Sequence, residues 1–168
     1  LSSVHYISYN RIVSAMSSLY GITISEGAVD NIIKRSSKLS SKEIEKITKE
    51  LELGDIVGID ETGCKVDGVK YWHWAFQNEN STLIVANKSR GTKVITETFE
   101  DGFVNACVVH DNYSSYSSLV AKDEQLCLAH KLRDLNYAIE CDDTQVMRDI
   151  KQLIQEAMLD HKENLIPP

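Results

Sequence analysis

Residues 55–111 restrict the fold of this chain more than any other segment. Its apolar stretches are separated by short turn sequences, and Asp67-Gly68 is a two-residue turn of the kind that closes β-hairpins. A helix then leads to a fourth strand, and a strand reached through a helical crossover is usually parallel to its neighbour in the sheet. The sequence therefore predicts a mixed sheet, with strands at residues 55–66, 69–77, 82–86 and 106–110 and a helix at residues 92–99.

Acidic residues end two of these predicted strands. Asp60 ends the apolar run of the first strand, and Asp111 ends that of the fourth. A carboxylate at the end of a buried strand is unfavourable unless its charge is compensated, so two such acids indicate a divalent-metal site. If the fourth strand pairs in parallel with the first, the two acids lie side by side, as in the ribonuclease-H-like arrangement. Two metal ions about 4 Å apart are a common means of phosphoryl transfer.

The N-terminal part of the chain is predicted to be helical. Tyr9–Tyr20 has the apolar spacing of an amphipathic helix, and Gly21 stops it. Ser25 is expected to cap a second helix, and Ser40 with Glu43 has the pattern of a capping box for a third. The first two helices have the outline of a helix-turn-helix, although most short helix pairs only pack together, so DNA reading and packing both remain open.

The chain after Asp111 is also predicted to be helical. We expect helices at residues 113–119 and 126–139 and a last helix from about residue 142. The expected buried face of the last helix consists of Val146, Ile150, Ile154, Ala157 and Met158.

Charge and composition limit the possible partners and locations. The net charge of −7 counts against strong autonomous DNA binding, but it does not exclude a catalytic core that is held on DNA by other segments. The four cysteines form no CxxC pair, which favours reduced thiols in a cytosolic protein. No apolar run approaches the roughly 18 residues of a membrane span. We therefore expect a cytoplasmic protein, and because Leu1 is not Met, we expect it to be a piece of a longer chain.

Several motifs, taken in their order and spacing, resemble the central region of insertion sequence 66 family transposases. Residues 6–25 also resemble the segment that precedes the catalytic core of that family. The motifs are Asp60-Glu61-Thr62-Gly63, Tyr71-Trp72-His73-Trp74, Ser89-Arg90, Asp111-Asn112-Tyr113-Ser114-Ser115-Tyr116, and Cys127-Leu128-Ala129-His130 with Arg133.

The resemblance implies a DDE transposase, which has a ribonuclease-H-like core and three metal-binding acids. Asp60 matches the first acid and Asp111 the second. The third is a Glu that follows a helical insertion; Glu156 and Glu163 lack its sequence context, so we expect the third acid to lie beyond Pro168. The resemblance also implies two Mg²⁺ or Mn²⁺ ions, transposon-end and target DNA as partners, and a homo-oligomeric active complex. The expected domains are a helical segment at residues 1–53, a ribonuclease-H-like core at 54–140 and the start of the insertion at 141–168.

Further polar residues are candidates for supporting roles. Glu61 points to the opposite face of its strand from Asp60, so we expect it either to support the site or to have a structural role, and not to bind metal. His130 and Arg133 share a helix face and either contact phosphate or the acids, or form polar contacts between helix and sheet. Arg90 either contacts phosphate or is solvated in its loop. Trp72 and Trp74 share one sheet face, and they are expected to pack in the core, as are Tyr113 and Tyr116.

These residues lead to one main interpretation of function and two alternatives. The main one is a fragment of a DNA transposase that catalyses metal-dependent strand cleavage and strand transfer as part of the full-length enzyme. Residues 1–168 alone are expected to be inactive, because the third acid is missing from them. The alternatives are a nuclease of the same fold and a catalytically inactive DNA-binding or assembly fragment of a decayed element.

Overall fold

The computed structural model describes residues 7–162 of the chain. These residues form two compact units that divide between Ile47 and Thr48, and each unit is described by itself. The predictions that concern Glu163 and the residues beyond it lie outside the described part of the chain. None of the described helices is long and apolar enough to cross a membrane.

The first unit contains the predicted helix pair. Helix α2 spans Tyr9–Tyr20 and helix α3 spans Glu26–Leu39. Gly21 ends α2 with a left-handed φ of 65°, and the Oγ atom of Ser25 accepts a hydrogen bond from the N–H of Ala28 at 3.1 Å. The predicted end of the first helix at Gly21 and the predicted N-cap of the second helix at Ser25 are therefore confirmed.

The predicted capping box at Ser40 is wrong. Ser40 has helical backbone angles (φ −84°, ψ −1°), and helix α4 (Ser41–Glu52) follows α3 after this single residue. The Ser40 hydroxyl donates to the carbonyl of Ser36 at 2.9 Å, so it satisfies the end of α3 and does not cap α4.

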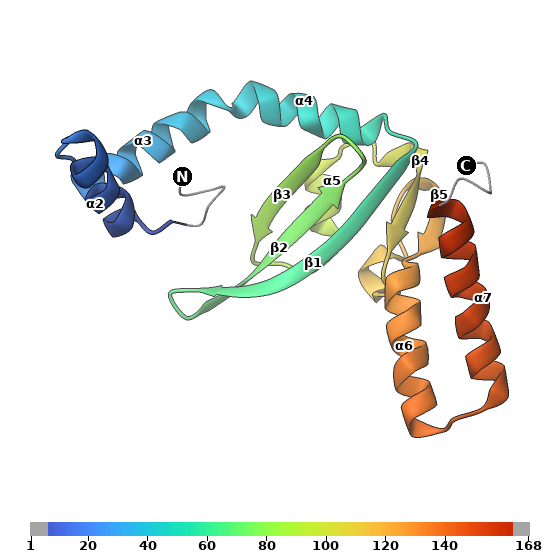
Figure 1. Ribbon diagram of the computed structural model, residues 1–168. Helices are drawn as coiled ribbons and strands as arrows, with labels where there is room; N and C mark the ends of the chain where they lie inside the picture. Colours follow the sequence, from blue (N-terminus) through green and yellow to red (C-terminus); the bar gives the residue numbers. More distant parts are fainter. Residues whose placement is uncertain (1–6, 163–168) are drawn as a thin grey trace. The chain divides into compact units, whose positions relative to one another are not determined.

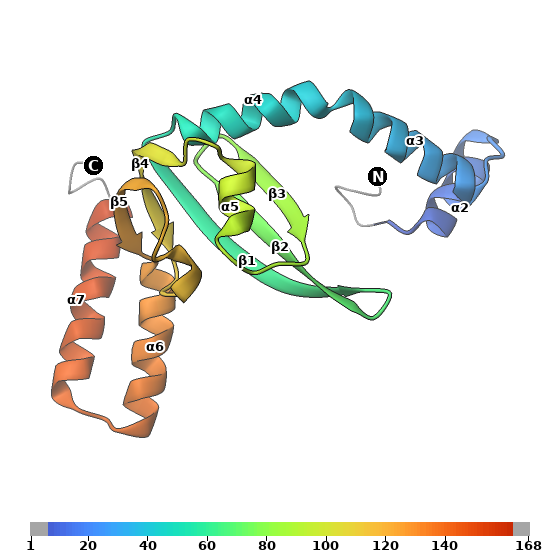
Figure 2. The same cartoon turned by 180° about the vertical axis from the view of Figure 1, so that it is seen from behind.

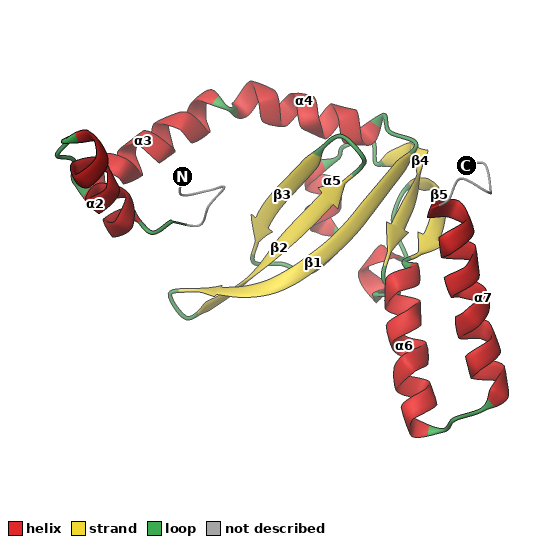
Figure 3. Ribbon diagram, viewed as in Figure 1, coloured by secondary structure: helices red, strands yellow, loops and turns green. Residues whose placement is uncertain are grey.

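The second unit is built on a five-stranded sheet with the strand order β3-β2-β1-β4-β5 (Figure 3). The first three strands are antiparallel neighbours, whereas β1 and β4 are parallel, as are β4 and β5. This is the mixed, ribonuclease-H-like sheet that the sequence predicted. The strands are β1 (Ile56–Val66), β2 (Val69–Gln77), β3 (Thr82–Asn87), β4 (Phe103–His110) and β5 (Ala121–Leu126).

Local sequence sets the register of the β1–β2 hairpin. Asp67 and Gly68 both have positive φ, 50° and 78°, as a type I′ turn requires. Val66 therefore pairs with Val69, and the pairing continues to Gly58 opposite Gln77.

Strand β5 was not predicted, and the helix expected at residues 113–119 is wrong. That segment contains a 3₁₀ turn at Ser114–Tyr116, labelled η1, and Ala121–Leu126 then forms a strand. The sequence Ala-Lys-Asp-Glu-Gln-Leu shows no apolar alternation, because β5 is an edge strand whose side chains are mostly exposed. Charged side chains are common on edge strands, and they conceal the periodicity of two that marks a half-buried strand.

Two helices follow the sheet, as predicted. Helices α6 (Leu128–Cys141) and α7 (Gln145–Lys162) form a helical hairpin (Figures 1 and 2). The expected burial of the apolar face of α7 is wrong, because Val146 is 65% and Ile150 44% exposed. The spacing of apolar residues identifies such a face, but it does not identify what covers it.

The core of the second unit lies between the sheet and the short helix α5 (Lys93–Thr98), which covers one face (Figure 2). Aromatic side chains dominate this core. The ring of Phe99 lies 4.8 Å from that of Phe76 and 4.6 Å from that of Phe103. Trp74 is fully buried, as predicted, and it packs edge-on against Tyr116.

Gly102, immediately before β4, is expected to tolerate no side chain. Its φ is +66°, and an added Cβ atom would lie 2.7 Å from the carbonyl oxygen of Val120, next to β5. Gly102→Ala should therefore destabilise the protein by more than the roughly 1–2 kcal/mol of left-handed strain alone. Gly68→Ala is the matched control, because its φ is +78° and its surroundings are open. Equal losses in urea-unfolding free energy for the two variants would contradict this packing.

Candidate active site

The pairing of β1 with β4 places Asp60 and Asp111 at adjacent positions. Gly58 is opposite Val109, and the two acids follow two residues later on their respective chains. Asp60 is exposed within β1, whereas Asp111 is partly buried just after the end of β4. The structure therefore brings together the two acids that the sequence singled out.

Each of these carboxylates is oriented by a backbone N–H. Oδ1 of Asp60 accepts from the N–H of Glu61 at 2.9 Å, and Oδ1 of Asp111 accepts from the N–H of Tyr113 at 3.0 Å. Within residues 7–162, the second oxygen of neither carboxylate has a hydrogen bond. Two hard oxygen donors are thus available, and they fit a divalent cation such as Mg²⁺. They are an incomplete ligand set, since no group of three or more potential metal ligands occurs in this part of the chain.

Glu61 lies on the opposite face of β1 from Asp60 and is held by two partners. Its side chain is 1% exposed, and Oε1 lies 2.8 Å from Nε and 2.7 Å from Nη2 of Arg90. The hydroxyl of Tyr116 donates to Oε2. The buried negative charge is therefore compensated by a cation and by charge-assisted hydrogen bonds.

Arg90 is not a solvated loop residue. Its guanidinium lies 4.6 Å from the centre of the Trp72 ring and 3.7 Å from that of Tyr113, and the side chain is 33% exposed. Burial lowers the pKa of Arg90, but the hydrogen bond and the charge of Glu61 outweigh it, so the pKa is raised. Arg90 is therefore firmly protonated in the folded protein.

The loop that carries Arg90 is joined to the segment after β4. The Ser115 hydroxyl donates to the carbonyl of Arg90 at 3.0 Å, and the Thr92 hydroxyl donates to the carbonyl of Ser115. On the sheet side, Nε1 of Trp74 donates to the carbonyl of Ser89 at 3.2 Å. These contacts connect the β3–α5 loop both to the sheet and to the segment that follows Asp111.

Tyr116 is expected to make the free energy of unfolding depend on pH. Burial raises the pKa of its phenol, and the Glu61 carboxylate raises it further. The folded pKa is thus above the unfolded value of about 10, and the resulting stability is present in full below pH 10 and is lost above it. We expect the unfolding free energy to fall above pH 10, by up to about 1.4 kcal/mol per pH unit for this group. Urea titrations from pH 9 to 11 should show a smaller fall for Tyr116→Phe; an identical fall would contradict the assignment.

Sequence reasoning did not identify His110. It is buried, and its ring lies 4.5 Å from that of Tyr116. Nδ1 contacts the carbonyl of Asp111, while Nε2 lies 3.4 Å from a carboxylate oxygen of Glu124 without forming a hydrogen bond. The sequence contained one signal for this residue. Neighbouring side chains on a strand point to opposite faces, so the position of His110 directly before Asp111 indicates a side chain on the other face of the sheet.

His130 and Arg133 lie in the first half of α6. Nδ1 of His130 is buried without a hydrogen-bond partner in the described residues, and Arg133 is exposed. Neither side chain forms a hydrogen bond or ion pair with Asp60 or Asp111 in this part of the chain. The proposed role of these two residues near the acid pair therefore stays a prediction.

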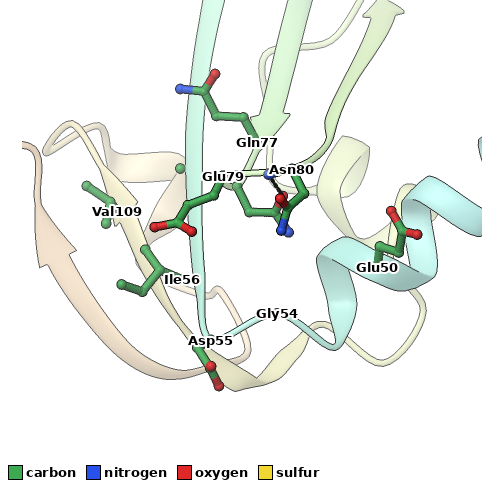
Figure 4. A pocket seen from close by; sticks show the side chains of 10 residues that line it. Glu50, Gly54, Asp55, Ile56, Gln77, Glu79, Asn80 and Val109 are labelled. Carbon is green, nitrogen blue, oxygen red and sulfur yellow. Dashed lines mark hydrogen bonds between the residues drawn. The ribbon is translucent and has the colours of Figure 1, made fainter. Parts of the chain in front are cut away.

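A pocket lies beside the start of β1, and neither Asp60 nor Asp111 is among its lining residues (Figure 4). Gly58 and Val109, the last residue pair before the acids, contribute to its wall. Its charged lining residues are Glu50, Asp55 and Glu79, and it has no basic residue. An acidic lining repels phosphate, so the side chains of this pocket do not favour contact with DNA.

An acid within β1 and a second acid just after the adjacent parallel strand β4, in a mixed sheet of order 3-2-1-4-5, form a ribonuclease-H-like arrangement. The sequence model of the transposase IS66 family matches residues 3–164. The chain belongs to that family. No curated protein matches it.

Solved structures with some similarity are viral integrases. The HTLV-2 integrase catalytic core domain in complex with magnesium, in its trimeric form, is 11% identical, with a TM-score of 0.36 over 60% of this chain and 81% of that one. The simian T-cell lymphotropic virus intasome in complex with PP2A regulatory subunit B56 gamma is 12% identical, with a TM-score of 0.36 over 60% of this chain and 46% of that one. We draw no functional conclusion from similarities at this level.

Proposed function

We propose that this chain supplies the DNA-cleaving and strand-transferring core of a transposase, with Asp60 and Asp111 as two of its metal-binding acids. The observation that carries the proposal is the β1–β4 register, which brings these two acids to adjacent positions. Membership of a transposase family supports the reaction class. Residues 54–140 form the catalytic part of this proposal, with residues 1–53 and 141–168 as its flanking segments.

The residue types suit a pair of Mg²⁺ or Mn²⁺ ions, which prefer carboxylate oxygens. Asp60 would contribute to holding both ions and Asp111 to holding one of them, and a backbone N–H orients each carboxylate. When bound, such ions promote in-line displacement at phosphorus, because they activate the attacking oxygen and stabilise the charge on the leaving oxygen. The proposed site needs a third carboxylate, and we assign none of the described residues to that role, so residues 1–168 alone are proposed to be inactive.

DNA is the proposed substrate, and the active complex is proposed to be a homo-oligomer. Arg133, which is exposed, is available for a phosphate contact, and His130 lies three residues before it on α6. Arg90 is a weaker candidate, because its guanidinium is bound to Glu61. The net charge of −7 implies that the affinity for DNA depends on local basic residues and on assembly.

The experiment that tests this function separates cleavage from joining. A complete transposase that contains this chain is incubated with a duplex that ends in the transposon terminus, a target plasmid, and Mg²⁺ or Mn²⁺. A transposase yields joined products, a nuclease yields cut ends only, and an inactive DNA-binding fragment yields neither. The last two results would each overturn the proposal.

A further inference from the structure

We propose that Glu61 is a positioning residue that holds Asp60 and Asp111 in place relative to each other. The inference rests on the proposed function, because it gives Glu61 a role toward the two acids. It concerns a residue that binds no metal itself, since its carboxylate is buried on the other face of the strand.

The first connection runs through the backbone of Glu61. Its N–H donates to Oδ1 of Asp60 at 2.9 Å and so fixes the orientation of that carboxylate. The backbone of Glu61 is paired with Trp74 of β2, and its side chain is further anchored in the core by Arg90 and Tyr116. Anchoring on one face of β1 therefore orients the acid on the other face.

The second connection runs through the side chain of Glu61 and two further residues. The carboxylate binds the guanidinium of Arg90, and that guanidinium lies 3.7 Å from the centre of the Tyr113 ring. The N–H of Tyr113 in turn donates to Oδ1 of Asp111 at 3.0 Å. Tyr116, three residues after Tyr113, reaches the same carboxylate through its hydroxyl. Glu61 thus holds the segment that orients Asp111.

The sheet alone does not provide this restraint. The parallel pairing of β1 with β4 ends at Gly58 and Val109, so no ladder hydrogen bonds join the backbones at Asp60 and Asp111. Two neighbouring carboxylates also repel each other when no cation lies between them. Partners that orient metal-binding side chains contribute substantially to metal affinity, and the cluster around Glu61 is placed to act in this way.

A buried ion pair is a plausible positioning device because its net contribution to stability is small. Desolvation offsets much of the attraction between the charges, so an apolar pair of similar volume is often as stable. An apolar pair would fill the space without fixing the direction of the loop that carries Arg90 or of the segment after Asp111. An orienting role for this cluster therefore does not require a large net contribution to stability.

Binding of Mn²⁺ to the 168-residue chain, followed by the electron paramagnetic resonance signal of free Mn²⁺, tests the inference. We expect Glu61→Gln and Tyr116→Phe to weaken the Mn²⁺ affinity of the Asp60–Asp111 site about 10-fold to 100-fold. Tyr116→Phe removes one hydroxyl and keeps the ring, so it reports on the cluster even if Glu61→Gln folds poorly. Asp60→Ala and Asp111→Ala define how much of the bound Mn²⁺ belongs to the site.

Two controls separate a positioning effect from the loss of a negative charge and from a general loss of stability. Glu97→Gln removes the same charge from the exposed Lys93–Glu97 pair on α5, and it should leave the affinity unchanged. Leu83→Ala weakens the buried core away from the cluster, and it should lower stability without a comparable loss of affinity. Unchanged affinity in both Glu61→Gln and Tyr116→Phe, or an equal loss in Leu83→Ala, would overturn the inference. Wild-type Mn²⁺ binding by both aspartate variants would instead overturn the proposed metal site.

Discussion

Replacing Asp60 or Asp111 with alanine in the complete transposase is expected to lower DNA cleavage and strand transfer at least about 10⁴-fold, the scale seen when one member of a catalytic group that acts as a unit is lost. Each variant removes one proposed metal ligand from a pair that occupies adjacent positions at the end of the β1–β4 pairing. Quantifying nicked and joined DNA products over time with Mg²⁺, and again with Mn²⁺, measures the loss.

The fold should survive these substitutions. Asp60 is exposed, so its replacement is expected to change the free energy of unfolding by about 0.5 kcal/mol or less. Asp55→Ala is a matched control, because Asp55 is an exposed acid immediately before the same strand and has no proposed role. Cleavage at the wild-type rate by either Asp60→Ala or Asp111→Ala would refute the assignment of the site.

Arg90→Ala is expected to destabilise the 168-residue chain by about 2–3 kcal/mol. It would leave the Glu61 carboxylate buried with Tyr116 as its remaining hydrogen-bond partner. Loss of one partner of a fully buried ion pair typically costs about 3–5 kcal/mol. The side chain of Arg90 is 33% exposed, so water can partly replace it, which places the expected loss below that range. Urea unfolding at neutral pH, followed by circular dichroism, measures the change.

A double variant shows whether an unpaired charge causes this loss. Arg90→Ala combined with Glu61→Gln removes the buried anion, so the combined loss should be smaller than the sum of the two single losses. Lys93→Ala is the surface control, because its ion pair with Glu97 is exposed and should contribute less than about 1 kcal/mol. A loss of less than about 0.5 kcal/mol in Arg90→Ala would contradict the observed burial of Glu61.

Local sequence signals predicted much of the sheet. The turn at Asp67-Gly68 fixed the hairpin, because few residue pairs adopt two positive φ angles, and Val69–Gln77 formed the expected return strand. The crossover rule predicted that β4 would be parallel to its neighbour in the sheet, and the structure shows β4 parallel to β1. Strand β5 was missed because an exposed edge strand has no apolar alternation to read. The apolar pattern of α7 likewise contained no information about a covering partner.

The candidate site was predictable only in part, because some of its contacts join distant residues. The adjacency of Asp60 and Asp111 followed from strand order, and the opposite orientation of Glu61 followed from the alternation of side chains along a strand. The partners of Glu61 did not follow, because Arg90 and Tyr116 lie 29 and 55 residues away in sequence. No periodicity encodes such contacts, so phosphate contact and solvation were the two roles that could be predicted for Arg90.

The central claim is that Asp60 and Asp111 belong to a metal-dependent strand-transfer site. The most direct test is the joining of a transposon-end duplex to target DNA by a complete transposase containing this chain, with Mg²⁺ or Mn²⁺ and with a chelator. Joined products are expected with either metal, and they should disappear with the chelator and in the Asp60→Ala and Asp111→Ala variants. Joined products that persist with the chelator, or in either aspartate variant, would contradict the claim.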